Sequence, residues 1–86
     1  PEAIRPPILA VLREAGGPLE AEDVFDRLEA RMADSLLEAD RELTPEGELR
    51  WRFAARRARQ ALIVEGLMAK SRPGLWELTD AGFADH

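Results

Sequence analysis

Seven basic side chains gather between positions 50 and 76, a stretch in which Glu65 is the only acidic residue. They are Arg50, Arg52, Arg56, Arg57, Arg59, Lys70 and Arg72. A guanidinium group donates paired hydrogen bonds to guanine or to phosphate, and an ammonium group neutralises phosphate as a point charge. The cluster therefore predicts a binding surface for a polyanion, with double-stranded DNA as the partner.

The overall charge of the chain opposes this prediction, but the distribution of charge supports it. The 86 residues carry a formal net charge of −5. Residues 1–47 hold five basic and twelve acidic residues, a balance of −7, whereas residues 48–86 hold seven basic and five acidic residues, a balance of +2. Because the local field decides where a polyanion docks, we expect contact through the basic segment alone.

Five of the arginines lie on a segment, 48–65, in which apolar residues recur with helical spacing. Four residues fall along one line of such a helix and predict its buried face: Trp51, Ala55, Ala58 and Leu62. The opposite face carries Phe53, Arg56, Arg57 and Gln60. The flanks carry Arg50, Arg52 and Arg59. The segment is therefore a candidate recognition helix.

Each side chain outside the predicted core has a DNA-contacting interpretation and a structural one. Arginine can pair with guanine and Gln60 with adenine, while flanking arginines neutralise phosphates. Phe53 could lie against the methyl group of thymine or 5-methylcytosine, although an aromatic residue here more often contacts the core, a helix or a second copy. Clustered arginines can also form a solvated face paired with acids. Ile63 and Val64 pack under the hairpin or form a partner surface.

The elements that must position this helix can be read from turn and capping signals. Helices are expected at 6–15, where Pro6 and Pro7 suit the first turn, and at 21–33, with a short extended piece at 18–20 between them. Asp34-Ser35 could cap a further short helix through Leu36 and Leu37, which in its longer form reaches Leu43. Gly66 is placed to stop the third helix.

The C-terminal part predicts a β-hairpin followed by one turn of helix. Strands are expected at 67–71 and 75–79 around the turn Arg72-Pro73-Gly74, with Trp51 and Trp76 as packing residues. Thr79 or Asp80 could cap the last helical turn, which carries Phe83.

Three helices followed by a hairpin is the element order of a winged helix-turn-helix domain, an α+β fold that is mainly α. We expect residues 1–86 to form one such domain. Its third helix would enter the major groove, and a wing at 69–76 would bring Lys70 and Arg72 to the DNA backbone.

Several short stretches together resemble a known family. They are Ile4-Arg5-Pro6-Pro7-Ile8-Leu9, Gly16-Gly17, Glu65-Gly66-Leu67, and Gly74-Leu75-Trp76-Glu77-Leu78-Thr79 followed by Asp80-Ala81-Gly82. Over residues 4–84 the chain resembles the N-terminal domain of Mrr-type restriction endonucleases. The resemblance implies a winged helix that binds DNA beside a separate nuclease domain, in enzymes that attack modified, often methylated, foreign DNA. At Arg57 and Ala61 the chain departs from the aromatic residues usual in that family.

A catalytic centre is not expected within this chain. The resemblance implies cleavage by an Asp…Glu/Gln-x-Lys pattern, but the single lysine, Lys70, is preceded two positions earlier by Met68. Ser35 and Ser71 lie in no nucleophile motif, and His86 is the only histidine, so it has no plausible second metal ligand. We therefore expect no metal, no cofactor and no small-molecule substrate.

Composition limits the remaining possibilities. The chain has no cysteine, and no apolar run approaches the roughly 20 residues that span a bilayer. We expect a cytoplasmic, nucleoid-associated protein whose partner is double-stranded DNA, methylated or not, with no membrane contact. A homodimer stays open, as do two alternative functions: a winged-helix protein-interaction or dimerisation module, and a small transcriptional repressor.

Overall fold

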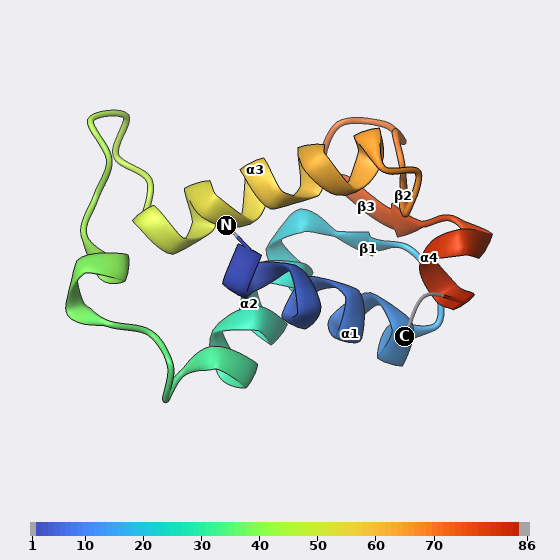
Figure 1. Ribbon diagram of the computed structural model, residues 1–86. Coiled ribbons are helices and arrows are strands. Elements are labelled where there is room, and N and C mark those ends of the chain that lie inside the picture. Colours follow the sequence, from blue (N-terminus) through green and yellow to red (C-terminus); the bar gives the residue numbers. More distant parts are fainter. Residues whose placement is uncertain (1, 85–86) are drawn as a thin grey trace.

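The computed structural model describes residues 2–84 and has the winged-helix architecture (Figure 1). Its helices are α1 (Arg5–Ala15), α2 (Ala21–Met32), α3 (Arg50–Val64) and α4 (Asp80–Ala84), and its strands are β1 (Leu19–Glu20), β2 (Met68–Ala69) and β3 (Leu75–Leu78). Two short 3₁₀ helices, η1 (Glu2–Ile4) and η2 (Glu38–Arg41), complete the order. The predicted fold class, α+β and mainly α, is confirmed.

The three strands form an antiparallel sheet in the order β1-β3-β2. Leu19 pairs with Trp76 and Met68 pairs with Leu78, so the expected pairing of the first strand with the hairpin is confirmed. We call the hairpin of β2 and β3 the wing. Its strands are shorter than predicted, because Lys70 and Ser71 leave the ladder before the turn.

An aromatic cluster joins α2, α3 and the wing at the centre of the core. The ring of Phe25 meets Trp51 edge-on at 5.9 Å between centroids and Trp76 at 5.5 Å. Such pairs contribute about 0.5–1.5 kcal/mol each beyond the burial of their area. All three rings are buried, which confirms the packing role predicted for both tryptophans.

The predicted buried face of α3 is correct at every position. Trp51, Ala55, Ala58 and Leu62 are all buried, and the two alanines let the helix lie close to its neighbours. The Gly66 stop is also confirmed: Gly66 has φ +83°, its N–H bonds Ile63 O at 3.0 Å, and the Leu67 N–H bonds Leu62 O at 2.9 Å. These bonds fix where α3 ends and the wing begins.

The start of α3 and the preceding loop differ from the prediction. The helix begins at Arg50 and not at position 48, because Leu49 is extended with ψ 138°. The short helix expected from Leu36 toward Leu43 is partly correct: a 3₁₀ helix, η2, forms at Glu38–Arg41, but Leu36 and Leu37 are not helical. The Ser35 and Leu36 amides continue the turn that ends α2, and η2 begins later, where the Asp40 carboxylate accepts the Leu37 N–H at 2.9 Å.

The C-terminal helix α4 is docked tightly between the wing and α1. The hydroxyl of Thr79 accepts the Gly82 N–H at 3.1 Å, which confirms the predicted cap. Arg13 donates from Nε to Gly82 O at 3.1 Å, joining α1 to α4. A side chain at position 82 would place its Cβ 2.0 Å from Leu67 O, so glycine is required there.

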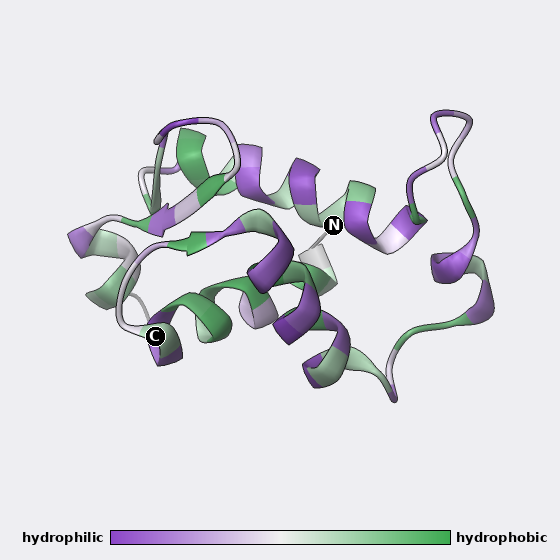
Figure 2. Ribbon diagram, turned by 180° about the vertical axis from the view of Figure 1, so that it is seen from behind, coloured by the Kyte–Doolittle hydropathy of each residue, from purple (hydrophilic) through white to green (hydrophobic). Residues whose placement is uncertain are grey.

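The overall arrangement leaves one long side of α3 uncovered. In Figure 1, α1 and α2 lie on one side of α3, the wing lies beside its C-terminal half, and the loop 33–49 extends away from the body. Figure 2 shows hydrophilic residues recurring along α2 and α3, whereas α1 is largely hydrophobic. The uncovered side of α3 carries the candidate residues.

Candidate nucleic-acid interface

The outward face of α3 carries side chains that point away from the core. Phe53 is 43% exposed, Arg57, Gln60 and Val64 are exposed, and all four recur with helical spacing. The Arg57 guanidinium lies 6.0 Å from the centroid of the Phe53 ring. Among the side chains that the structure describes, no acid forms an ion pair with Arg57. This stripe therefore presents a cation, an amide and an aromatic ring directly to solvent.

Two arginines on the N-terminal half of α3 are exposed but paired. Arg50 lies 3.5 Å from a carboxylate oxygen of Glu42, and Arg56 Nε donates to Glu48 at 2.9 Å. Both acids come from the loop that precedes the helix. Exposed pairs of this kind stabilise a fold by about 0–1 kcal/mol, so a phosphate can replace the carboxylate at small cost.

Arg52 points toward α2 and packs against the aromatic cluster. Its guanidinium carbon lies 4.9 Å from the centroid of Phe25 and 5.6 Å from that of Trp51, and its side chain is only 26% exposed. An ion pair of 3.4 Å with Glu22 completes its surroundings. Arg56 approaches the same Phe25 ring, also at 4.9 Å. Arg52 thus joins α3 to α2 and is not presented to a ligand.

Arg59 points toward the wing. Its guanidinium lies 5.6 Å from the centroid of Trp76 and donates to Leu75 O at 3.4 Å. Burial lowers the pKa of Arg59 from its ordinary value, and the positive charge of Arg56 lowers it further. A guanidinium still stays protonated at neutral pH. Arg59 therefore fixes the wing against α3, while its charge adds to the local positive field.

The wing presents one unpaired cation and one paired cation. Lys70 is exposed, and within the described part of the chain no carboxylate pairs with it. Arg72 pairs with Glu20 of β1, and its side chain is 60% exposed. The neighbouring Ser71 hydroxyl donates to Glu77 at 2.8 Å.

The structure thus divides the nine predicted residues into three groups. Phe53, Arg57, Gln60 and Lys70 face solvent without an acidic partner among the described residues. Arg50, Arg56 and Arg72 face solvent with one, whereas Arg52, which also pairs with an acid, and Arg59 turn inward. The acidic partners are Glu20, Glu22, Glu42 and Glu48. Sequence reasoning missed them, because none lies at the i+3 or i+4 spacing that marks a pair on one helix.

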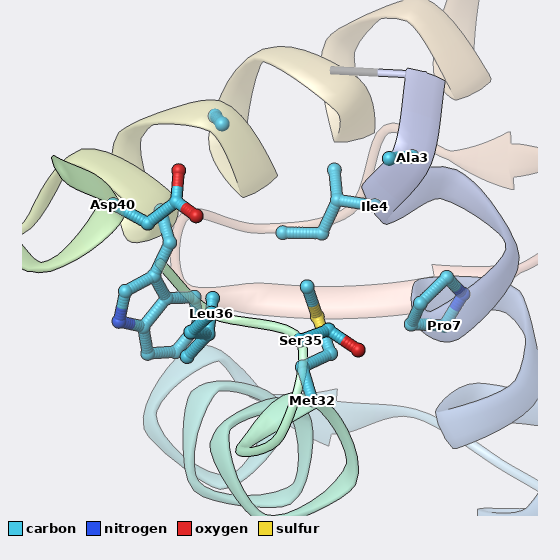
Figure 3. Close-up of a pocket in the computed structure, with 9 residues that line it drawn as sticks. Ala3, Ile4, Pro7, Met32, Ser35, Leu36 and Asp40 are labelled. Atoms are coloured by element: carbon cyan, nitrogen blue, oxygen red, sulfur yellow. The ribbon is translucent and has the colours of Figure 1, made fainter. Parts of the chain in front are cut away.

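The described part of the chain has a further feature, a pocket away from the outward face of α3. A pocket of about 320 Å³ opens between the N-terminal turns and the end of α2 (Figure 3), and its lining is mostly apolar apart from Ser35 and Asp40. Among residues 2–84, no group of three potential ligands could hold a metal ion. His86 lies outside the described residues. No described helix is long and apolar enough to cross a membrane.

A third helix with its outer face uncovered, flanked by a three-stranded sheet that includes the wing, defines this chain as a winged-helix domain. The chain belongs to the Mrr N-terminal domain family, which it matches over residues 2–84. This finding confirms the resemblance noted from the sequence and indicates the N-terminal domain of a restriction system, a domain that is not itself catalytic. Neither a curated protein nor a solved structure matches the chain.

Proposed function

We propose that this domain binds double-stranded DNA for a restriction system, with the outer face of α3 in the major groove. The observation that supports the proposal most directly is the solvent-facing stripe of Phe53, Arg57 and Gln60. It combines the side chains that read guanine, adenine and a pyrimidine methyl group. The protein would act in the cytoplasm, at the nucleoid, where DNA is available.

The remaining cations supply contacts to the DNA backbone. Lys70 reaches phosphate directly, while Arg50, Arg56 and Arg72 do so after exchanging their carboxylate partners. Three to five such contacts predict a log–log dependence of affinity on salt with a slope of about −3 to −4.5. Arg52 and Arg59 hold α3 and the wing in place for these contacts.

Fluorescence anisotropy with a short labelled duplex tests this function. We expect Arg57→Ala to weaken binding to a preferred sequence by about tenfold, because one base-reading pair contributes about 1–3 kcal/mol. Arg27→Ala removes the same charge from an exposed position on α2 and serves as the matched control. Binding that is undetectable at about 50 mM salt would refute the proposal.

Phe53 allows a separate test of the preference for modified DNA. If its ring lies against a methyl group, duplexes with 5-methylcytosine should bind more tightly than unmodified ones, and Phe53→Ala should abolish the difference. If Phe53→Ala weakens binding to both duplexes equally, the ring does not read a methyl group and instead positions Arg57, whose guanidinium lies over it.

A second candidate function is a protein-interaction or dimerisation module. Val64, which is 79% exposed, extends the same stripe as Phe53, and apolar side chains aligned on one helix face favour a protein partner. Sedimentation equilibrium distinguishes the two functions. A stable dimer that Val64→Asp dissociates would place α3 in an interface and remove it from the reach of DNA.

A further inference from the structure

The segment 42–50 is a small hairpin that ends at the first residue of α3. Leu43 and Leu49 form an isolated antiparallel bridge. The Thr44 N–H bonds Glu48 O at 2.7 Å, and the Arg50 N–H bonds Glu42 O at 2.8 Å. Gly47 closes the turn with φ +87°. The acidic loop hairpin, as we call residues 42–50, therefore has a defined backbone path and is not a loose connection.

This hairpin delivers two carboxylates to the N-terminal half of α3. Glu42 and Glu48 flank its turn, and each pairs with the arginine eight positions further along the chain. Glu48 is held closely: the Thr44 hydroxyl accepts its N–H at 3.2 Å, and its side chain is only 26% exposed. The third acid of the hairpin, Glu46, is exposed and forms no ion pair with any residue of the described chain.

We propose that Glu42 and Glu48 are internal competitors for DNA phosphate, which set how tightly the domain holds a duplex of any sequence. This inference rests on the proposed function. A phosphate that binds Arg50 or Arg56 must displace the paired carboxylate or lie beside it, and in both cases the carboxylate then stands next to a polyanion. Contacts to the DNA backbone are weakened, while Arg57 and Gln60 have no competing acid in the described part of the chain. A larger share of the affinity therefore comes from the base edges.

The competition has a signature in the salt dependence of binding. Each phosphate that a protein neutralises releases counterions from the DNA, so that added salt weakens the complex. A glutamate separated from its arginine takes up a cation, which offsets part of that release. Replacing the glutamate with glutamine removes the uptake, and the variant should show a steeper slope as well as a higher affinity.

A purely structural role for the two acids predicts a different result. α3 has no side-chain cap at its N-terminus, and carboxylates near that end stabilise a helix through its dipole. On that role alone, Glu48→Gln would lower the thermal stability and leave DNA binding unchanged or weaker. Competition predicts instead that Glu48→Gln binds DNA more tightly, while its thermal stability is unchanged or lower.

The test compares the wild-type chain with Glu48→Gln and with the double variant Glu42→Gln/Glu48→Gln, on a labelled duplex of mixed sequence. From the usual strength of exposed ion pairs, we expect DNA affinity at low salt to rise about threefold for the single variant and about tenfold for the double variant. The log–log slope should steepen by up to about one for each acid removed. Glu46→Gln, which changes the same charge in the same hairpin, should alter affinity by less than about twofold.

A double-mutant cycle locates the effect. In an Arg56→Gln background, Glu48→Gln should no longer raise affinity, because its partner is gone. A gain that persists in that background, or an equal gain from Glu46→Gln, would overturn the proposal in favour of long-range charge. If the wild-type chain binds DNA and Glu48→Gln binds it no more tightly, this inference is overturned and the proposed function stands. Failure of both proteins to bind DNA would overturn the proposed function and the inference with it.

Discussion

The two connections that flank α3 are held in place by different forces. The wing is anchored by Met68, Trp76 and Leu78, which are 2%, 2% and 5% exposed. The loop 33–49 instead keeps Leu37 and Leu43 at 69% and 65% exposure. It packs against the core through the partly buried Leu36 and Leu49, and hydrogen bonds and ion pairs hold it as well. Burying one large apolar side chain stabilises a fold by about 1.5–3 kcal/mol, whereas an exposed ion pair contributes about 0–1 kcal/mol.

Because of this difference, we expect the wing to be rigid and the loop 33–49 to be more mobile, although both flank the same helix. Because the wing shares the core, it can move only when much of the domain unfolds. We expect the acidic loop hairpin to open more easily, while α1, α2 and α3 stay packed. We therefore expect the arginines beside the hairpin to exchange partners more readily than Arg59 beside the wing. The following substitutions test this contrast, from the largest expected effect to the smallest.

Trp76→Ala should be the most damaging. It removes the ring that contacts Phe25 and Arg59, and truncation of a buried aromatic residue costs about 3–5 kcal/mol. Urea denaturation followed by circular dichroism should show a domain that is largely unfolded. The more conservative Trp76→Phe should retain the fold. A loss below about 1 kcal/mol for Trp76→Ala would show that the wing is not part of the core.

Gly82→Ala should follow. Its Cβ would meet Leu67 O at 2.0 Å, so α4 must move away from the wing and the Arg13 bond to Gly82 O is strained. Overpacking of this kind costs about 1–3 kcal/mol. Gly17→Ala is the matched control, because nothing lies within 4 Å of a Cβ there. Equal melting temperatures for the two variants would contradict the docking of α4.

Gly47→Ala should act on the hairpin alone. A non-glycine residue in the left-handed conformation costs about 1–2 kcal/mol, and the added Cβ meets no other atom within 4 Å. The hairpin should open locally before the domain unfolds. Hydrogen exchange at the Thr44 and Arg50 amides should accelerate, and DNA should bind more tightly as Arg50 is released. If the exchange rates of these amides do not change, the hairpin does not open locally, and the contrast with the wing is wrong.

Leu43→Ser should have the smallest effect. The side chain is 65% exposed, and surface substitutions usually change stability by less than about 0.5 kcal/mol. Leu78→Ser, a change of the same type in the wing, should be severely destabilising because that side chain is buried. A large loss for Leu43→Ser in chemical denaturation would mean that another molecule or segment covers this leucine.

Much of the fold could be predicted because its signals are local. The buried face of α3 follows from apolar residues at helical spacing, and its end follows from Gly66, whose positive φ suits a helix terminus. The wing follows from short apolar runs around a proline-glycine turn. The bounds of α3 and the helix expected near Leu36 were less accurate. There, backbone bonds in the loop replaced the helical ones.

The amino-acid sequence by itself determined which residues of α3 are buried, the order of the elements and the family to which the chain belongs. Only the tertiary structure decided which of the basic side chains are free. Arg57 and Lys70 are unpaired within the described chain, Arg56 is held by Glu48, and Arg52 turns toward Phe25. The reason is physical: helical periodicity depends on near neighbours, whereas an ion pair depends on the path that a loop takes through space.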